Sequence, residues 1–416
     1  MTFLEQSRNA SQANKQKMIK LKRLGRHSQG VAQVWRVYAF LLVFVPAIPS
    51  AKAQVAPTLS DSARITLITV APGDELYSTF GHNALRVWDP LNRIDQCYDY
   101  GTFDFDQPNF YLNFCLGKLL YTLDVSPYRY FERANLRSQR LMREQWLNLD
   151  GSQRQKMFET LETNALPQNR YYKYDFFYDN CATRIRDILR EGFMYRITLD
   201  SSLAQKGSSM RQLLRPYLSD KPWTQFGIDL VLGMPTDRKA RADDYMFLPD
   251  YVHDVFAATR LDTDIPLVKA EKRIPAVPFP TFEFKPWFFG NPFWVMLVVA
   301  LIGLLSMANP RAERIFDRLF WLVLGLAGFI IAFLWFATDH QATKTNLNIL
   351  WALPTHLLFF WRRTRSEWVE NYFIAAAILA ALTLVFWKWL PQELPLAATP
   401  IAALVVVKGL WRVRKG

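Results

Sequence analysis

The chain has 416 residues, a formal net charge of +13 and hydrophobic side chains at 50% of its positions. This length allows two or three structural units. Residues 1–53 carry 9 Lys and Arg against 1 acidic residue, residues 54–285 carry 29 against 30, and residues 286–416 carry 12 against 6. Because the basic excess lies beside apolar segments, it indicates membrane topology and argues against binding to nucleic acid.

The N-terminus has the parts of a secretory signal. A basic region leads into the apolar run Val37–Ile48, and Ala51-Lys52-Ala53 matches the small-x-small pattern of a cleavage site. The alternative is an uncleaved anchor helix, for which the apolar run is short. We therefore expect a signal peptide over residues 1–53 and an exported domain over residues 54–285.

The exported domain begins with strand-like segments. Arg64–Val70 is rich in β-branched residues, His82–Trp88 alternates in polarity, and turn residues lead into a third strand near Gln96–Phe103. The segment Pro108–Phe131 is dense in aromatic residues and leucines. It is either part of the core or a surface that contacts acyl chains or a membrane.

Two helices are expected next, over Glu132–Leu149 and Gly151–Leu166, from apolar residues at helical spacing. A further helix is expected to begin at Cys181, because Asp179 and Asn180 are favourable N-cap residues. The positive end of the helix dipole favours the thiolate form of a cysteine in this position.

Cys181 and His82 are a candidate nucleophile and base. A histidine accepts a proton near neutral pH and can return it to a leaving group. A small buried thiol and a packed histidine are the alternative interpretation. Cys97 and Cys115 are either bridged or buried thiols, and in both cases Cys181 remains unpaired. No metal-binding spacing is present, so we expect no metal and no cofactor.

Five apolar segments follow a proline-rich connector, Ile274–Pro286. They are Phe288–Met307, Leu319–Ala337, Ile349–Trp361, Tyr372–Trp389 and Ala398–Trp411. Basic residues cluster after the first, third and fifth segments, which places these linkers in the cytoplasm and the exported domain on the opposite side. The sequence therefore predicts an all-α domain of about five spans over residues 286–416, although the third and fifth segments are short.

Several motifs together resemble the Lnb N-terminal periplasmic domain of bacterial Lnb-type lipoprotein N-acyltransferases. The matching segments are Thr69–Gly73, Ser78–His82, Tyr98–Phe105, Tyr174–Arg184 and Phe247–Asp250. Thr338-Asp339-His340, with Asn346 and Asn348, is similar to the membrane-side signature of that family. A histidine strand followed by an Asn-Cys helix is also similar to permuted papain-like enzymes of the NlpC/P60 and lecithin–retinol acyltransferase type. The resemblance implies an α+β, permuted papain-like catalytic domain.

The resemblance further implies a thiol acyltransferase of the bacterial inner membrane with its catalytic domain in the periplasm. Cys181 would attack a phospholipid ester with His82 as base, and the thioester would pass its acyl chain to the α-amine of a lipoprotein. Backbone N–H groups at the start of the cysteine helix would bind the oxyanion. The residue that orients His82 is Asp99, Tyr100 or Asn180.

Ser78, Arg184 and His340 are the candidate substrate-binding residues. Arg184 either meets a phosphate head group or lies on a charged helix face. His340 either helps to receive a head group or the acceptor, or belongs to a linker in which Asp339 and Asn346 cap helices. The alternative functions are a Cys-His hydrolase or amidase acting on peptidoglycan or lipid, and a non-catalytic envelope scaffold or transporter accessory.

Overall fold

The structure is a computed structural model. It describes residues 56–193, 197–198, 202, 207–261, 264–275, 290–359 and 366–414. The expected signal peptide, most of the proline-rich connector and the arginines between the third and fourth apolar segments lie outside these residues. All described residues belong to one compact unit that begins at Ala56. We call residues 56–275 the sheet domain and residues 290–414 the helical domain.

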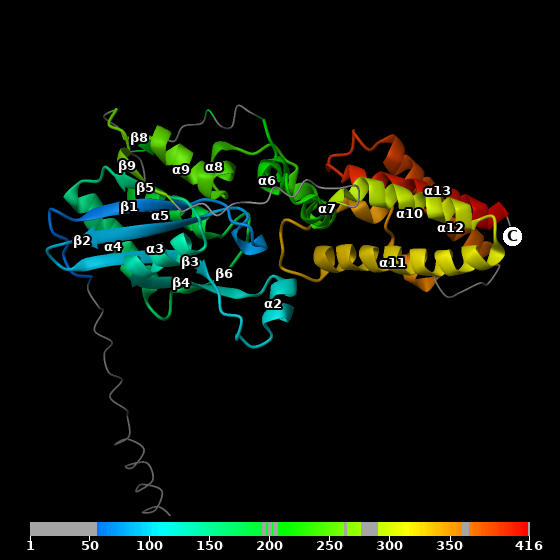
Figure 1. The fold of residues 1–416 in the computed structure, drawn as a ribbon, viewed down its shortest axis with the longest axis horizontal. Coiled ribbons are helices and arrows are strands. Elements are labelled where there is room, and N and C mark those ends of the chain that lie inside the picture. The colour runs from blue at the N-terminus through cyan, green and yellow to red at the C-terminus, as the bar shows by residue number, and fades with distance from the viewer. Residues whose placement is uncertain are drawn as a thin grey trace, which may run out of the picture. The chain divides into compact units, whose positions relative to one another are not determined.

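The sheet domain is built on an antiparallel seven-stranded sheet with the strand order β6-β4-β3-β2-β1-β5-β9 (Figure 1). The strands are β1 (Arg64–Val70), β2 (His82–Asp89), β3 (Ile94–Thr102), β4 (Leu120–Pro127), β5 (Met142–Leu147), β6 (Tyr171–Lys173) and β9 (Val268–Ile274). The first three lie where alternation and β-branched residues predict them. β1 and β2 pair from Arg64↔Trp88 to Val70↔His82, which places His82 at one end of the sheet.

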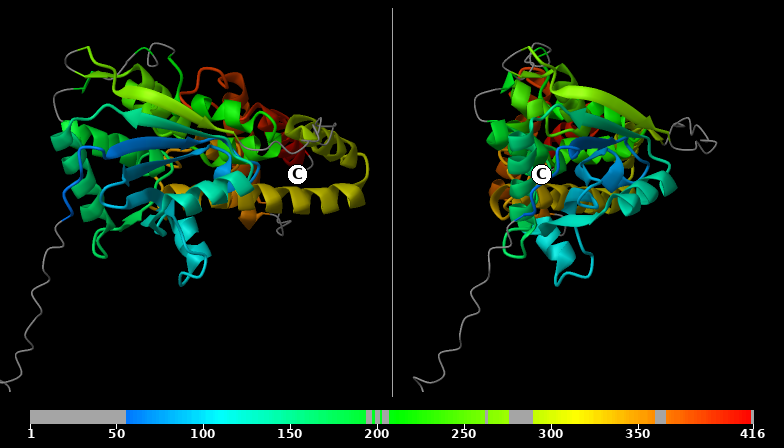
Figure 2. Two further views of the ribbon diagram at one scale, coloured as in Figure 1. Left: turned by 60° about the vertical axis from the view of Figure 1, so that its left-hand side comes forward. Right: turned by 90° about the vertical axis from the view of Figure 1, so that its left-hand side faces the viewer.

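Helices cover both faces of this sheet. One face packs against α4 (Gly151–Ala165), α5 (Cys181–Phe193) and α9 (Pro249–Ala258) in the largest apolar core. The other face packs against α3 (Tyr128–Arg137). Mixed helices and antiparallel strands agree with the predicted α+β class. Figure 2 shows the sheet domain from two further sides.

The prediction of a single helix over Glu132–Leu149 is wrong in its second half. Helix α3 ends at Arg137, Gln139 follows with a positive φ of 56°, and the next residues form β5. β5 pairs with β1 on one side and β9 on the other. Ladder hydrogen bonds and cross-strand packing on both sides outweigh the helical spacing of this segment.

The remaining elements of the sheet domain are short. They are α2 (Phe110–Leu116), α6 (Met210–Leu218), α7 (Pro222–Val231), α8 (Ala242–Tyr245), and the strands β7 (Ile197–Thr198) and β8 (Arg260–Leu261), which pair with each other. The aromatic segment Pro108–Phe131 lies partly in the core and partly at the surface. Phe110, Leu123 and Phe131 are buried, whereas Tyr111 is 77% exposed.

The helical domain contains α10 (Pro292–Ser306), α11 (Pro310–Phe336), α12 (Glu367–Val385) and α13 (Thr399–Arg414). Within the described residues, three helices are long and apolar enough to cross a membrane: α11, α12, and α13 with the turn before it. α10 is a shorter apolar helix. The third apolar segment forms no long helix where it is described. It makes two 3-10 turns, Leu347–Leu350 and Pro354–Leu358, so the five-helix prediction is not met there.

Glycines let this irregular segment lie directly on α11. A Cβ atom at Gly328 would be 2.1 Å from the Ala352 carbonyl oxygen, and one at Gly325 would be 2.7 Å from the Leu357 nitrogen. The third apolar segment therefore runs antiparallel to α11, and the backbones of the two segments are in contact. Non-helical backbone at membrane depth is tolerated where protein covers it, which this packing provides.

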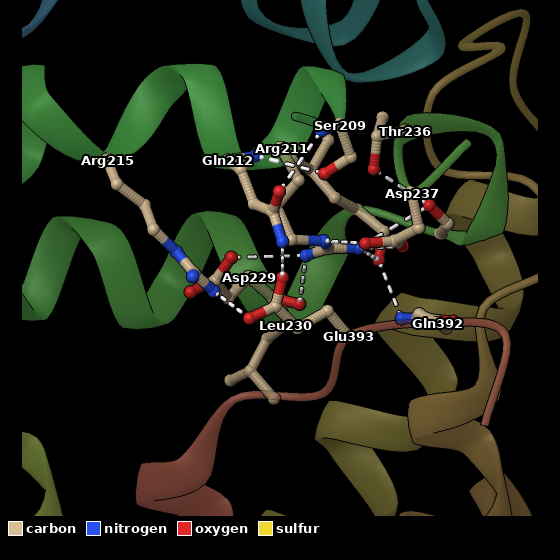
Figure 3. A network of polar contacts seen from close by, with 12 residues as sticks. Ser209, Arg211, Gln212, Arg215, Asp229, Leu230, Thr236, Asp237, Gln392 and Glu393 are labelled. Atoms are coloured by element: carbon tan, nitrogen blue, oxygen red, sulfur yellow. Dashed lines mark hydrogen bonds and ion pairs between the residues drawn. The ribbon is translucent and has the colours of Figure 1, made fainter. Parts of the chain in front are cut away.

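A buried arginine organises the part of the sheet domain that meets the helical domain (Figure 3). Arg211 on α6 is 1% exposed and donates hydrogen bonds to Asp229 (3.1 Å) and Asp237 (2.8 Å). A buried guanidinium needs such partners, because an unpaired charge is costly in this environment. The three residues hold α6 and α7 together.

The loops of the helical domain bind to this cluster. Gln392 donates to the Leu232 carbonyl (2.9 Å) and to Asn346 Oδ1 (3.1 Å), and Asn346 donates to the Leu230 carbonyl (2.7 Å). Arg215 pairs with Glu393 beside them (Figure 3). These bonds satisfy the last carbonyls of α7, which would otherwise lack partners at a helix end.

Candidate active site

His82 and Asp99 form a short hydrogen bond at the end of the sheet. His82 opens β2 and Asp99 lies on the neighbouring strand β3. The register Leu85↔Tyr98 places the two side chains diagonally on one face. His82 Nε2 lies 2.5 Å from Asp99 Oδ1, and the side chains are 23% and 22% exposed. With Nε2–H donating to the carboxylate, Nδ1 is the ring nitrogen that remains free to accept a proton.

Cys181 occupies the first position of α5 and is 7% exposed. Its thiol lies close enough to the His82 imidazole to act on the pKa of that ring. Burial alone lowers the pKa of His82, but the Asp99 carboxylate and Cys181 together raise this pKa well above 6.5. An imidazole with a raised pKa next to a sulfur atom is suited to hold the proton that a nucleophilic cysteine gives up.

A bulge in β3 brings the cysteine helix to this end of the sheet. The pairing of β3 with β4 shifts between Tyr100 and Thr102, and Gly101 between them has a φ of +94°. This φ favours glycine, because a side chain would be strained there. A Cβ atom at Gly101 would be 3.8 Å from Cys181 Cβ and 3.7 Å from Tyr174 Cε2, so both residues lie directly against the bulge.

The two other residues predicted to orient His82 are placed elsewhere. Asn180 caps α5: its Oδ1 accepts from the backbone N–H groups of residues 182 and 183 (both 2.9 Å), and its Nδ2 donates to the carbonyls of Phe176 and Phe247. Tyr100 lies in the core on the opposite face of the sheet, where its hydroxyl accepts from Asn164 Nδ2 (3.0 Å). Asp99 is therefore the one of the three that contacts His82.

The Asn180 cap also changes the expected oxyanion site. Because the Ala182 and Thr183 N–H groups already donate to Asn180, they are not free to bind an oxyanion. Among the hydrogen bonds of the described residues, none is donated by the Cys181 N–H. This N–H is the remaining backbone donor at the start of α5.

The three predicted substrate-binding residues have structural contacts. Ser78 Oγ donates to the Glu75 carbonyl (3.0 Å) inside the loop before β2. Arg184 pairs with Asp179 (2.5 Å) and its guanidinium lies 3.9 Å from the centre of the Tyr172 ring. His340 does not contact Cys181.

His340 instead joins the loop after α11 to α2. Its Nε2 lies 3.1 Å from the Phe114 carbonyl oxygen, and the adjacent Asp339 pairs with Lys173 (3.0 Å). The loop therefore faces the sheet domain, and its role in receiving a head group or the acceptor stays a prediction. Asn346 caps the 3-10 turn that follows, whereas the Asp339 carboxylate pairs with Lys173 and caps no described helix, so the capping prediction is confirmed for Asn346 alone.

Two polar groups near Cys181 were missed by the sequence interpretation. The Tyr172 hydroxyl is buried without a hydrogen-bond partner in the described part of the chain. A Cβ atom at Gly101 would be 3.9 Å from it and 3.8 Å from Cys181 Cβ. Arg140 has a buried terminal nitrogen, Nη2, that also lacks a partner there. Burial lowers the pKa of Arg140, while Tyr77, Cys181 and Asp99 act on it electrostatically in the opposite direction.

Neither residue had a signal in the sequence. Arg140 falls in the segment predicted to be helical, whereas the structure places it in the turn between α3 and β5. Tyr172 lies in a run of aromatic residues, any of which suits a core.

Cys97 and Cys115 are both free. Cys97 is buried in β3 and Cys115 is exposed on α2, so there is no bridge, and the alternative of two buried thiols is correct for Cys97 and wrong for Cys115. No group of three or more metal-binding side chains occurs in the described ranges.

Comparison with known proteins identifies both parts of the chain. Residues 53–215 match the Lnb N-terminal periplasmic domain, and residues 280–415 match the Lnb transmembrane domain. No curated protein and no solved structure matches the chain significantly. The papain-like arrangement and the inner-membrane location therefore stay predictions. The chain belongs to the Lnb family, whose domains indicate a membrane-associated, lipoprotein-modifying protein with a periplasmic part.

Proposed function

We propose that this protein is a thiol acyltransferase that moves an acyl chain from a phospholipid to the N-terminal amine of a lipoprotein. The observation that supports this most directly is the chain of contacts Cys181–His82–Asp99, in which a thiol at a helix start meets an imidazole held by a carboxylate. In this proposal Cys181 is the nucleophile, His82 is the general base and acid, and Asp99 positions the imidazole.

The first step forms a thioester. The Cys181 sulfur attacks the ester carbonyl carbon of the donor while His82 holds the thiol proton. The tetrahedral intermediate collapses by breaking the bond to the glycerol oxygen, and His82 returns the proton to that oxygen. The products are S-acylated Cys181 and a lysophospholipid.

The second step transfers the chain to the acceptor. A neutral α-amine attacks the thioester carbonyl, the carbon–sulfur bond breaks, and the proton lost by the nitrogen returns to the sulfur by way of His82. The products are an amide and free Cys181. Water in place of the amine gives a fatty acid, which is the reaction of the alternative Cys-His hydrolase.

Two neighbouring groups suit the charges in these steps. Within the described residues, the Tyr172 hydroxyl and the Cys181 N–H donate no hydrogen bond, so we assign them to the oxyanion of both tetrahedral intermediates. The Arg140 Nη2 nitrogen, which is buried and has no partner in the described part of the chain, belongs to a cation near the same site and fits the phosphate of the donor. Tyr172→Phe should slow acyl transfer by about 10²-fold, the usual effect of removing one oxyanion donor.

The test uses the full chain in phospholipid vesicles with isotope-labelled acyl chains and a diacylglyceryl-cysteine lipopeptide as acceptor. We expect mass spectrometry to find the labelled chain on the Cys181 peptide before the acceptor is added and on the lipopeptide amine afterwards. Cys181→Ala should abolish both products, and Cys115→Ala should retain them. Labelled lipopeptide made by Cys181→Ala would refute the thioester, and fatty acid as the only product would identify a hydrolase.

A further inference from the structure

Helix α2 carries an exposed apolar surface, which we call the α2 surface: Tyr111, Leu112 and Phe114, together with Phe105 in the preceding loop. These side chains are 77%, 57%, 54% and 63% exposed. Clusters of large exposed apolar side chains commonly mark interaction sites. Helix α2 is therefore a candidate docking element of the sheet domain.

Contacts with the helical domain place the α2 surface beside a membrane boundary. The Asp339 N–H donates to the Leu116 carbonyl (2.9 Å), and His340 Nε2 lies 3.1 Å from the Phe114 carbonyl oxygen. Both residues follow directly on α11, which ends at Phe336 and is long enough to cross a membrane. Figure 1 shows α2 next to the loop that follows α11.

The charges around these contacts suit a lipid surface. The hydrogen bond from Lys173 to Asp339 (3.0 Å) and the charges of Lys173, Lys118 and Lys344 lower the pKa of the Asp339 carboxyl. Lysines next to exposed aromatic residues at the end of a spanning helix are typical of the interfacial zone, where cations meet lipid phosphates and amphipathic rings lie at head-group depth.

Aromatic rings connect the α2 surface with the nucleophile. Tyr174 lies against Gly101, opposite Cys181, and stacks on Tyr121 with ring centres 4.1 Å apart. Tyr121 is 5.2 Å from Phe103, and Phe103 is 6.0 Å from Phe110, the first residue of α2. We call Tyr174, Tyr121, Phe103 and Phe110 the aromatic track.

We propose that the α2 surface inserts into the outer leaflet of the membrane that holds the helical domain, and that the aromatic track carries the donor's acyl chain from there to Cys181. The second half of this inference rests on the proposed acyl transfer. A chain that leaves the bilayer exposes methylene groups to water at a cost, and contact with apolar rings removes most of that cost. Tyr121, Phe103 and Tyr174 are half-buried, so part of each side chain is accessible for this contact.

Membrane insertion is tested without any need for activity. Both proteins compared carry Cys181→Ala, which removes the reactive thiol. Of the two remaining cysteines, Cys115 lies on α2 and is exposed whereas Cys97 is buried, so a thiol-reactive fluorophore labels α2 selectively. In phosphatidylethanolamine–phosphatidylglycerol vesicles, spin-labelled lipids should quench this fluorophore. The matched control carries Cys115→Ser and Ser152→Cys, with the label on the exposed first turn of α4. It should not be quenched.

Equal quenching of both labels, or none at Cys115, would overturn the insertion. A third outcome is a Cys115 label that is shielded from the lipids and becomes exposed when the protein is diluted among empty vesicles. This would identify a second copy of the chain as the partner that covers the α2 surface, and it would also overturn the membrane insertion.

The track is tested by comparing two donors. Phe103→Ala and Tyr121→Ala should lower transfer from a long-chain vesicle phospholipid by about tenfold, the effect of exposing about two methylene groups. Both variants should retain acylation of Cys181 by a soluble butyryl thioester. Tyr130→Ala, which removes an exposed ring on α3 outside the track, should change neither rate.

Equal losses with both donors, or no loss with the long-chain donor, would overturn the track. If the unmodified chain transfers from neither donor, the proposed function fails and the track with it. The Cys115 quenching result then still decides the membrane insertion on its own.

Discussion

Replacing Asp99 by Asn removes the carboxylate that holds His82 while it keeps the shape of the side chain. The 2.5 Å bond between the two is charge-assisted when the imidazole is protonated, and such bonds contribute about 1.5–3 kcal/mol. Because both side chains are about a fifth exposed, we expect the lower part of this range. A loss of about 2 kcal/mol corresponds to about 30-fold slower acylation of Cys181.

The same substitution should change the pH dependence of the thiol. Asp99 raises the pKa of His82, so Asp99→Asn lowers this pKa and leaves less imidazolium to stabilise the thiolate near neutral pH. Iodoacetamide alkylation of the full chain, followed by mass spectrometry of the Cys181 peptide, measures this without a substrate. We expect the alkylation profile of Asp99→Asn to move to higher pH.

Asp124→Asn is the matched control for this change. Asp124 pairs with Asp99 across β3 and β4, is exposed, and carries the same charge. In the described part of the chain, the hydrogen bond of the His82 imidazole goes to Asp99 and not to Asp124. The reasoning would be refuted if Asp99→Asn and Asp124→Asn had the same acylation rate and the same alkylation profile.

Three further predictions concern stability, each measured by thermal or chemical unfolding. The raised pKa of His82 stabilises the fold below about pH 6.5, and this contribution is lost as the pH rises through the folded-state pKa. Asp99→Asn should therefore be less stable than Asp124→Asn at pH 6 and equally stable at alkaline pH. A stability difference that stays constant with pH would contradict this. Arg211→Ala should lower the free energy of unfolding by about 3–5 kcal/mol, because it leaves Asp229 and Asp237 buried without their partner. Arg215→Ala, at a side chain that is 41% exposed, should lower it by about 0–1 kcal/mol. Similar losses for the two variants would show that burial is not the cause. Gly328→Ala should destabilise the helical domain because its Cβ would meet the Ala352 carbonyl. Gly227→Ala, inside α7 with open space around the new Cβ, should leave the stability unchanged or raise it by up to about 1 kcal/mol. A Gly328→Ala protein as stable as the unmodified chain would contradict the close packing.

Local sequence was sufficient for the elements that carry the candidate nucleophile and base. The cap at Asn180 and the apolar spacing after it predict a helix that begins at Cys181, and alternation predicts the strand that begins at His82. Both signals depend on neighbouring residues alone. The run of apolar segments likewise indicates a membrane domain, because hydrophobic length is a property of the sequence itself.

Tertiary structure decided which residues meet. Asp99 contacts His82 because β2 and β3 pair in one register, and a shift of one residue would turn its side chain to the other face. Three other features depend on contacts between residues far apart in the chain. They are the bulge at Gly101, the turn that places Arg140 near Cys181, and the close packing of the third apolar segment on the glycines of α11. A single sequence contains no local signal for such contacts, since their free energy arises only when the distant segments pack together.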